Sequence, residues 1–257
     1  MNVVRAATVI LGAALFSPAV AQQTDNSDKE SLEMTEARAK LKSEHGGQIV
    51  SLFFAERFEF LARDGDNELV WEAQGWRGTD EHKLWIKTEG EFSNETTDFE
   101  HAEFQALLSR AVRPFWDFQL GFRYDIKPNP SRTYAVVGFQ GLAPYWFELD
   151  SAIFLSDSGR VSARLEAEYE FRLTQRCILQ PRIELNAGFS DDTEIDLGLG
   201  LSSAEAGLRL RYEISRQLAP YVGVSWSSTF GETRKLQRAD GHSTSDMSAI
   251  IGIRFWY

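Results

Sequence analysis

Residues 161–173 read VSARLEAEYEFRL, and the two faces of this segment have opposite chemistry. An alternation with a period of two predicts a β-strand. The segment has thirteen residues, whereas strands in soluble sheets usually have about five or six. A tilted strand needs roughly 9–11 residues to cross a bilayer. The pattern therefore favours a strand with lipid on one side. The apolar face carries Val161, Ala163, Leu165, Ala167, Tyr169, Phe171 and Leu173, and the polar face carries Ser162, Arg164, Glu166, Glu168, Glu170 and Arg172.

The same alternation returns in residues 116–126, 179–189 and 206–214. The polar faces carry both charge signs, which suits a narrow barrel lumen crossed by arginine–carboxylate pairs. The sequence therefore predicts an all-β fold, a transmembrane antiparallel β-barrel of twelve strands. Because twelve is even, both ends of the barrel domain should lie on one side. The strands are expected near 52–63, 67–77, 82–92, 99–112, 115–126, 132–143, 145–155, 160–173, 177–190, 203–215, 220–229 and 246–257.

The final strand and the connections support a bacterial outer-membrane barrel. The last strand places Met247 and Phe255 on one face, and the chain stops on the aromatic Tyr257. Short periplasmic turns and longer outer loops are typical of this class. The first hairpins, with connections at 64–66 and 78–81, fit this alternation less well. Tight turns are expected at 113–114, 143–144, 174–176 and 217–219, and longer loops at 93–98, 127–131, 190–202 and 230–245.

The first 48 residues differ from the rest of the chain. Residues 1–21 have Arg5, an apolar stretch and an Ala-Val-Ala cleavage site, and so predict a secretory signal peptide. A buried N-terminal helix is the alternative interpretation. Residues 22–48 are polar and acidic and predict a periplasmic arm, disordered or with a short helix. Residues 49–257 then form the barrel.

Composition excludes several classes of protein. The chain has 257 residues and a formal net charge of −11. Nucleic acid is therefore not expected as a partner, because phosphate neutralisation requires an excess of Lys and Arg. A single cysteine excludes an intramolecular disulfide and a cysteine metal cage. We expect a monomer in the outer membrane, with the lipid bilayer around the barrel.

The sequence offers few residues for catalysis. Its histidines are His45, His82, His101 and His242, and none forms an evident pair with an outward-facing serine. We therefore expect a protein that is not an enzyme, with no catalytic residues and no bound organic cofactor. An outer-membrane lipase or protease is the alternative that such a pair would have supported.

Metal binding is the chemistry that the pattern best supports. His101 and Glu103 share one face of a predicted strand, and Glu89 and Glu91 lie on the neighbouring strand. Imidazole, carboxylate and thioether groups all bind copper, although the spacing alone does not select this metal. A lumen histidine that is hydrogen-bonded to a carboxylate explains the pair equally well. Further candidate ligands in the arm are Met34 and His45.

Several stretches resemble the copper resistance protein B family of proteobacterial outer-membrane barrels, and the resemblance covers roughly residues 50–257. The residues that carry it are Trp71-Glu72-Ala73-Gln74-Gly75-Trp76, Leu84-Trp85-Ile86-Lys87-Thr88-Glu89-Gly90-Glu91, Leu108-Ser109-Arg110-Ala111, Phe115-Trp116-Asp117, Gln140-Gly141-Leu142-Ala143-Pro144-Tyr145-Trp146-Phe147-Glu148, Thr174-Gln175-Arg176, Leu179-Gln180-Pro181-Arg182, Gly207-Leu208-Arg209-Leu210-Arg211-Tyr212-Glu213-Ile214 and Ala219-Pro220-Tyr221-Val222-Gly223-Val224.

The resemblance implies a role in periplasmic copper tolerance, with copper ions bound or passed without catalysis and a periplasmic multicopper oxidase as partner. Family members often carry a Met- and His-rich segment before the barrel. Here the arm has only Met34 and His45, so copper sites in the lumen or at its mouth become the stronger expectation. A small general porin or structural barrel, with charged ladders filling its lumen and no metal preference, is the alternative.

Overall fold

A computed structural model describes residues 33–37, 40, 48–63, 67–94, 98–192, 194–195, 197–239 and 243–257. The chain divides into two units, Met1–Gly47 and Gln48–Tyr257. The predicted signal peptide, residues 1–21, lies outside the described residues, as does most of the predicted arm, residues 22–48. Within that arm, residues 33–37 are helical and exposed.

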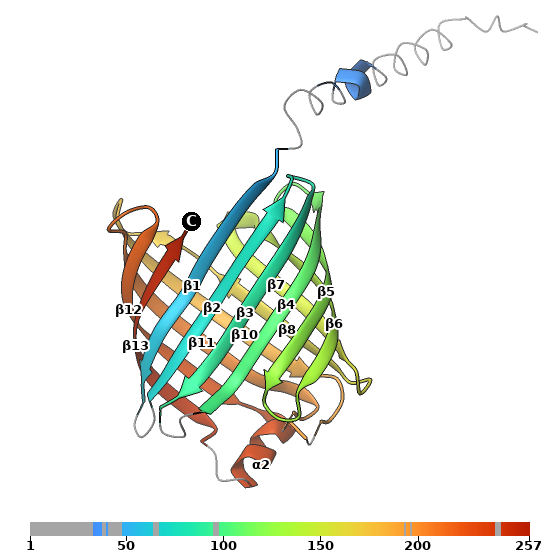
Figure 1. The fold of residues 1–257 in the computed structure, drawn as a ribbon. Coiled ribbons are helices and arrows are strands. Elements are labelled where there is room, and N and C mark those ends of the chain that lie inside the picture. The colour runs from blue at the N-terminus through green and yellow to red at the C-terminus, as the bar shows by residue number, and fades with distance from the viewer. Residues whose placement is uncertain are drawn as a thin grey trace, which may run out of the picture. The chain divides into compact units, whose positions relative to one another are not determined.

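The second unit is a sheet of strands that follow one another along the chain (Figure 1). A 3-10 turn, Pro144–Trp146, and a helix, α2 (Gly231–Ala239), lie between strands. The strands are β1 (Val50–Ala62), β2 (Asn67–Gly78), β3 (His82–Ser93), β4 (Asp98–Arg113), β5 (Trp116–Lys127), β6 (Arg132–Ala143), β7 (Phe147–Ser156), β8 (Val161–Glu168), β9 (Phe171–Arg172), β10 (Cys177–Gly188), β11 (Gly200–Tyr212), β12 (Leu218–Thr229) and β13 (Ser245–Trp256).

The segments β8 and β9 form a single strand. Both pair with β10 in one register, with Glu168 opposite Arg182 and Arg172 opposite Ile178. Between them the amide of Tyr169 donates to the carbonyl of Pro181 over 3.1 Å. Proline has no N–H to complete the ladder, so the regular pairing is interrupted there.

The sheet closes on itself because β1 pairs with β13. With β8 and β9 counted as one, the thirteen strand segments in the described part of the chain form twelve strands. The prediction of a closed, twelve-stranded antiparallel barrel is therefore confirmed. Closure pairs every strand edge, which a bilayer requires because lipid offers no hydrogen bonds to unpaired amides.

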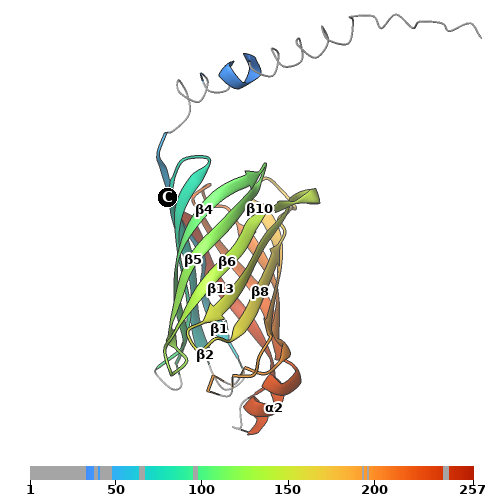
Figure 2. The same cartoon turned by 90° about the vertical axis from the view of Figure 1, so that its right-hand side faces the viewer.

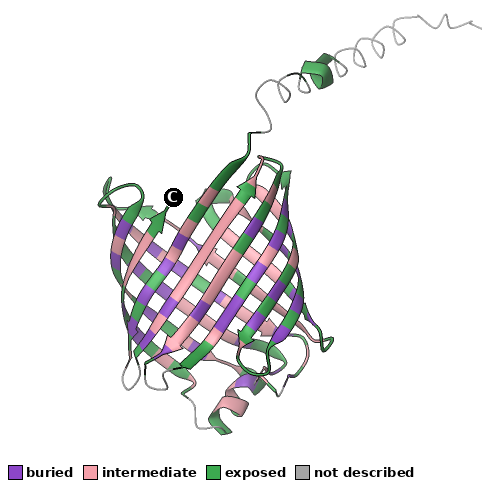
Figure 3. Ribbon diagram, in the orientation of Figure 1, coloured by how far each residue is buried: buried purple, intermediate pink, exposed green. Residues whose placement is uncertain are grey.

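Burial along the strands is inverted relative to a soluble protein (Figure 3). Large apolar side chains such as Leu108 and Phe122 are about two-thirds exposed, at 68% and 67%. Charged side chains such as Glu59 and Arg182 point inward and are buried. This arrangement is that of a barrel with an apolar outer band and a polar interior.

The lumen also contains apolar side chains. Two clusters of buried side chains face inward, because their positions share the inward phase of the alternation. One consists of Trp85, Leu107, Tyr134, Val136 and Phe154, and the other of Leu61, Val70, Tyr221 and Ile250. These side chains reduce the space inside the barrel.

Both ends of the strand sequence lie at one end of the barrel, which we call the terminal end. There Phe53 and Tyr257 exchange two backbone hydrogen bonds of 2.9 Å. At the opposite end, the distal end, the connections at 189–199 and 230–244 are long. The connections expected as long loops at 93–98 and 127–131 have only four residues each between their flanking strands, 94–97 and 128–131. The asymmetry between the two ends therefore rests on the last two distal connections.

The helix α2 lies in a segment for which the sequence analysis expected only a loop (Figure 2). Gly231 takes a φ of 58° at the turn out of β12, a conformation that glycine adopts without strain. The run that follows consists mainly of good helix formers. The buried Thr233 hydroxyl accepts a hydrogen bond of 2.9 Å from the amide of Gly198. The helix therefore packs against the other long distal connection.

Among the described residues, none of the helices has the length and apolar character needed to span a membrane.

Candidate functional site

The predicted metal ligands of β3 and β4 lie side by side in the lumen. Antiparallel register places Glu91 opposite His101 and Glu89 opposite Glu103. A bulge between Ala102 and Glu103 in the pairing with β5 changes the local twist without turning Glu103 away from the lumen. The structure therefore brings together the four predicted lumen residues.

The carboxylate of Glu103 is already surrounded by donors. Its side chain is only 1% exposed, and its oxygens lie 2.8 Å from Arg123 Nη2 and 3.0 Å from Arg164 Nη2. Gln105 Nε2 donates to Oε1 over 2.7 Å, and His101 Nε2 lies 3.4 Å from Oε2. A carboxylate has about four lone-pair positions. A metal ion at Glu103 would therefore have to displace an arginine or the histidine.

The other predicted ligands have different surroundings. Glu89 accepts a hydrogen bond of 2.7 Å from Arg164. Met34 is 58% exposed and belongs to the first unit. His45 lies outside the described residues. The structure thus groups the four lumen candidates.

Twelve paired charges of the lumen are connected with one another, and we call them the ion-pair network. Arg57 contacts Glu59 and Glu205, and Arg182 contacts Glu184 over 2.9 Å. The members are Arg57, Glu59, Glu72, Glu89, Glu103, Arg123, Arg164, Glu166, Arg182, Glu184, Glu205 and Arg209. Charge pairing compensates the desolvation of each group, which isolated buried charges could not offset.

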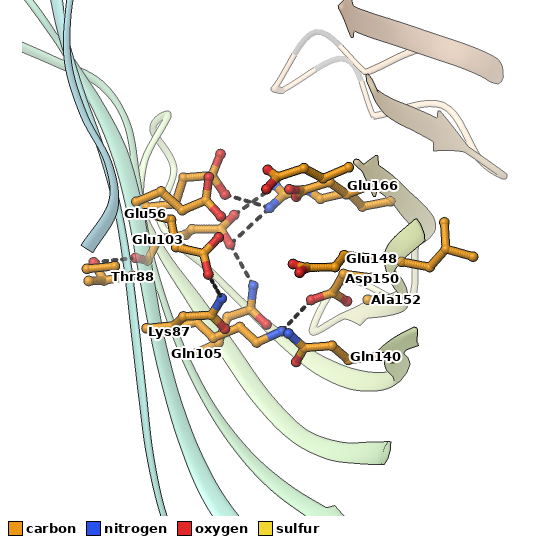
Figure 4. Close-up of a pocket in the computed structure, with 18 of the residues that line it drawn as sticks. Glu56, Lys87, Thr88, Glu103, Gln105, Gln140, Glu148, Asp150, Ala152 and Glu166 are labelled. Atoms are coloured by element: carbon orange, nitrogen blue, oxygen red, sulfur yellow. Dashed lines mark hydrogen bonds and ion pairs between the residues drawn. The ribbon is translucent and has the colours of Figure 1, made fainter. Parts of the chain in front are cut away.

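A cavity of about 250 Å³ lies beside this network (Figure 4). Its lining residues range from Gln140 and Leu142 near the terminal end of β6 to Phe154 near the distal end of β7, so it extends along the lumen. Its lining includes eight acidic residues and only two basic ones. The acidic residues are Glu56, Glu72, Glu89, Glu103, Glu148, Asp150, Glu166 and Glu168, and the basic ones are Lys87 and Arg164.

Three carboxylates of this cavity have no ion-pair partner within the described part of the chain: Glu56, Glu148 and Glu168. We call them the cavity carboxylates. Glu56 accepts a hydrogen bond of 2.7 Å from Gln74. Glu168 is hydrogen-bonded to Gln180 and interacts electrostatically with Glu56, Arg254 and Glu148. In Figure 4 the side chains of Glu56 and Glu148 point toward the cavity from opposite sides.

Sequence reasoning missed Glu56 for a definable reason. The neighbouring residues Arg57 and Glu59 face the lumen, and a regular strand would place Glu56 on the lipid side with Phe58. The register between β1 and β2 shifts between Ala55 and Arg57, so Glu56 is the extra residue of a β-bulge. A bulge re-aims a side chain. Glu148 carried a usable signal, since it shares the inward phase of β7 with Asp150.

The chemistry open to this arrangement is the attraction of cations. Among the described residues there is no group of three or more His, Cys, Asp or Glu side chains placed to hold a metal ion. The cavity therefore offers dispersed oxygen ligands and an acidic field. Such a field concentrates cations without fixing one of them in a tight cage.

Comparisons with known proteins agree with this fold. A family model described as "Copper resistance protein B precursor (CopB)" matches residues 49–257. "Copper resistance protein B" of Escherichia coli is 42% identical over 213 residues, which are 83% of this chain and 71% of that protein. "Copper resistance protein B homolog" of Pseudomonas syringae pv. tomato is 40% identical over 213 residues, 83% of this chain and 72% of that protein.

Among solved structures, the NanC porin superposes with a TM-score of 0.53 at 13% identity, covering 80% of this chain and 99% of that chain. At this identity the likeness concerns the fold alone, and it supports a closed β-barrel. The family match and the two relatives cover the barrel and its cavity. The chain therefore belongs to the copper resistance protein B family.

Proposed function

We propose that this chain serves copper tolerance at the outer membrane as a non-catalytic barrel that binds copper ions weakly or lets them pass. The observation that carries the proposal is the cavity with eight acidic and two basic lining residues. Copper binds carboxylate and imidazole groups. The identity of the metal is inferred from the names of the relatives, because the cavity by itself favours any cation.

The cavity carboxylates are the first contact that we assign to the ion. Glu56, Glu148 and Glu168 have no arginine to displace, in contrast to Glu103. His101, 23% exposed, and Glu91 opposite it in register supply a second position. Several weak positions suit an ion that must leave again, whereas one tight cage would trap it.

The wider arrangement follows from the same proposal. The terminal end faces the periplasm, because short turns are typical of that side. The arm then lies in the periplasm, where a multicopper oxidase is its expected partner. We propose a monomer surrounded by lipid.

Equilibrium dialysis of the folded protein in detergent against Cu(II), followed by metal analysis, tests the proposal. The wild type should retain copper, and the triple variant Glu56→Gln/Glu148→Gln/Glu168→Gln should retain less. Asp98→Asn, at the distal start of β4, is the matched control and should behave as the wild type. In the variant His101→Ala/Glu103→Ala, unchanged copper content would remove those two residues from the account.

A general porin or structural barrel is the second candidate, and the ion-pair network favours it because paired charges alone can fill a lumen. Wild-type protein that retains no more copper than the detergent blank would reject the copper proposal in favour of this candidate. Zinc and magnesium retained as strongly as copper would also favour it.

A further inference from the structure

We propose that the lumen is closed to ion flow in this conformation by the ion-pair network that crosses it. This inference concerns the path through the barrel and does not depend on which cation enters the cavity. It distinguishes a barrel that only binds cations in its cavity from one that conducts them through the membrane. The proposed function leaves both possibilities open.

The ion-pair network crosses the lumen instead of following its wall. Arg182 of β10 contacts Glu72 of β2 over 3.4 Å, although β11, β12, β13 and β1 lie between these strands in the sheet. Arg164 of β8 reaches Glu89 of β3 over 2.7 Å, although β4, β5, β6 and β7 lie between these strands on the shorter side. Side chains that join such distant strands must span the interior.

Little space is left between these crossing side chains. The gap bounded by Arg57, Glu72, Arg182, Arg209 and their neighbours holds about 10 Å³. A volume of roughly 10–15 Å³ admits about one water molecule. A hydrated cation cannot pass this point unless the pairs separate.

Apolar side chains narrow the lumen along one part of its wall. Leu61, Val70, Tyr221 and Ile250 form a buried apolar cluster between β1, β2, β12 and β13. These side chains offer no ligands to an ion that loses its hydration there.

At the distal end, ion pairs and a hydrogen bond also hold the connection between β10 and β11 in place. The carboxylate of Asp192, which is 1% exposed, pairs with Arg132 over 3.0 Å and also with Arg160. The same connection is held to α2 through Gly198 and Thr233. Figure 2 shows α2 at the end of the barrel opposite the C-terminus. The distal mouth is therefore held by buried charge pairs and a packed helix.

Conductance in planar lipid bilayers tests the closure. Wild-type protein should insert without steady conductance steps. The double variant Glu72→Ala/Arg182→Ala removes one of the two ion pairs that cross the lumen and leaves the carboxylates of Glu166 and Glu184 in place. It should therefore show steady, cation-selective conductance steps. Lys235→Gln, which breaks an exposed ion pair of α2, is the control and should remain silent.

Folding of each variant is checked by its heat-dependent mobility on gels. If the first double variant does not fold, the variant Glu89→Ala/Arg164→Ala removes the other ion pair that crosses the lumen. It should also show steady conductance steps. Steady conductance of the wild type would overturn the proposal. Folded double variants that show no conductance would also overturn it. Copper retention is measured separately, so loss of either result leaves the other proposal standing.

Discussion

Arg164 of β8 and Glu103 of β4 form a two-point contact across the lumen, with Nη2–Oε2 at 3.0 Å and Nη1–Oε1 at 3.2 Å. Glu103 is 1% exposed and Arg164 16% exposed. A two-point pair of this kind fixes both side chains in direction as well as position. The carboxylate that the sequence marks as a metal ligand is thus a structural group in this conformation.

Removal of Arg164 should destabilise the barrel strongly. The substitution Arg164→Ala leaves the carboxylates of Glu89 and Glu103 with fewer partners in a buried site. Breaking one partner of a buried pair costs about 3–5 kcal/mol. Urea-dependent folding into lipid vesicles measures this free energy. Asp98→Asn breaks an ion pair whose carboxylate is 58% exposed and should cost at most about 1 kcal/mol. Equal costs for the two variants would contradict a structural role for Arg164.

A charged side chain on the outer face should destabilise the folded barrel more when it lies deeper in the bilayer. Phe122 lies in the middle of β5, outward and 67% exposed. The substitution Phe122→Arg should cost about 2–4 kcal/mol in vesicles, the cost of arginine near the midplane. Phe115, in the turn before β5 at the terminal end, is the matched aromatic position. There an arginine should cost roughly 0–1 kcal/mol. A larger cost at Phe115 than at Phe122 would contradict lipid contact along β5.

Loss of the charge on Asp192 should loosen the connection between β10 and β11 at the distal end. The substitution Asp192→Asn removes the charge that holds Arg132 and Arg160, while it keeps the volume of the side chain. We expect faster proteolytic cleavage within residues 189–199, because cleavage needs local opening of the chain. Glu194→Gln is the control, since Glu194 contacts the same Arg132 but is 62% exposed. A cleavage rate equal to that of the wild type would show that Asp192 does not clamp this segment.

The sequence predicted the strands well because alternation is a local property. In β5 the outward phase of Phe122 and Tyr124 and the inward phase of Gln119 and Arg123 are legible from neighbouring residues alone. The number of strands and the closure followed from the same alternation. Expected boundaries failed where a local feature competes with it, as at Pro144–Trp146, where a 3-10 turn delays the start of β7.

The candidate site was less predictable from the sequence. The register of two adjacent strands brought Glu89 and Glu91 beside His101 and Glu103, as expected. The cavity carboxylates lie far apart in the chain, and Glu56 enters the cavity only through a bulge. A bulge has no reliable signature in a single sequence, so this residue could not be assigned to the lumen in advance.

The sequence by itself determined that lipid and lumen share the two faces of each strand and that the strands are twelve and close on themselves. Each of these properties depends on the spacing of side chains along one strand or on the pairing of neighbours. Only the tertiary structure decided that Arg182 meets Glu72 and that Arg164 meets Glu103. Such pairs depend on the tilt and stagger with which the whole sheet closes, and those quantities arise from all the strands together.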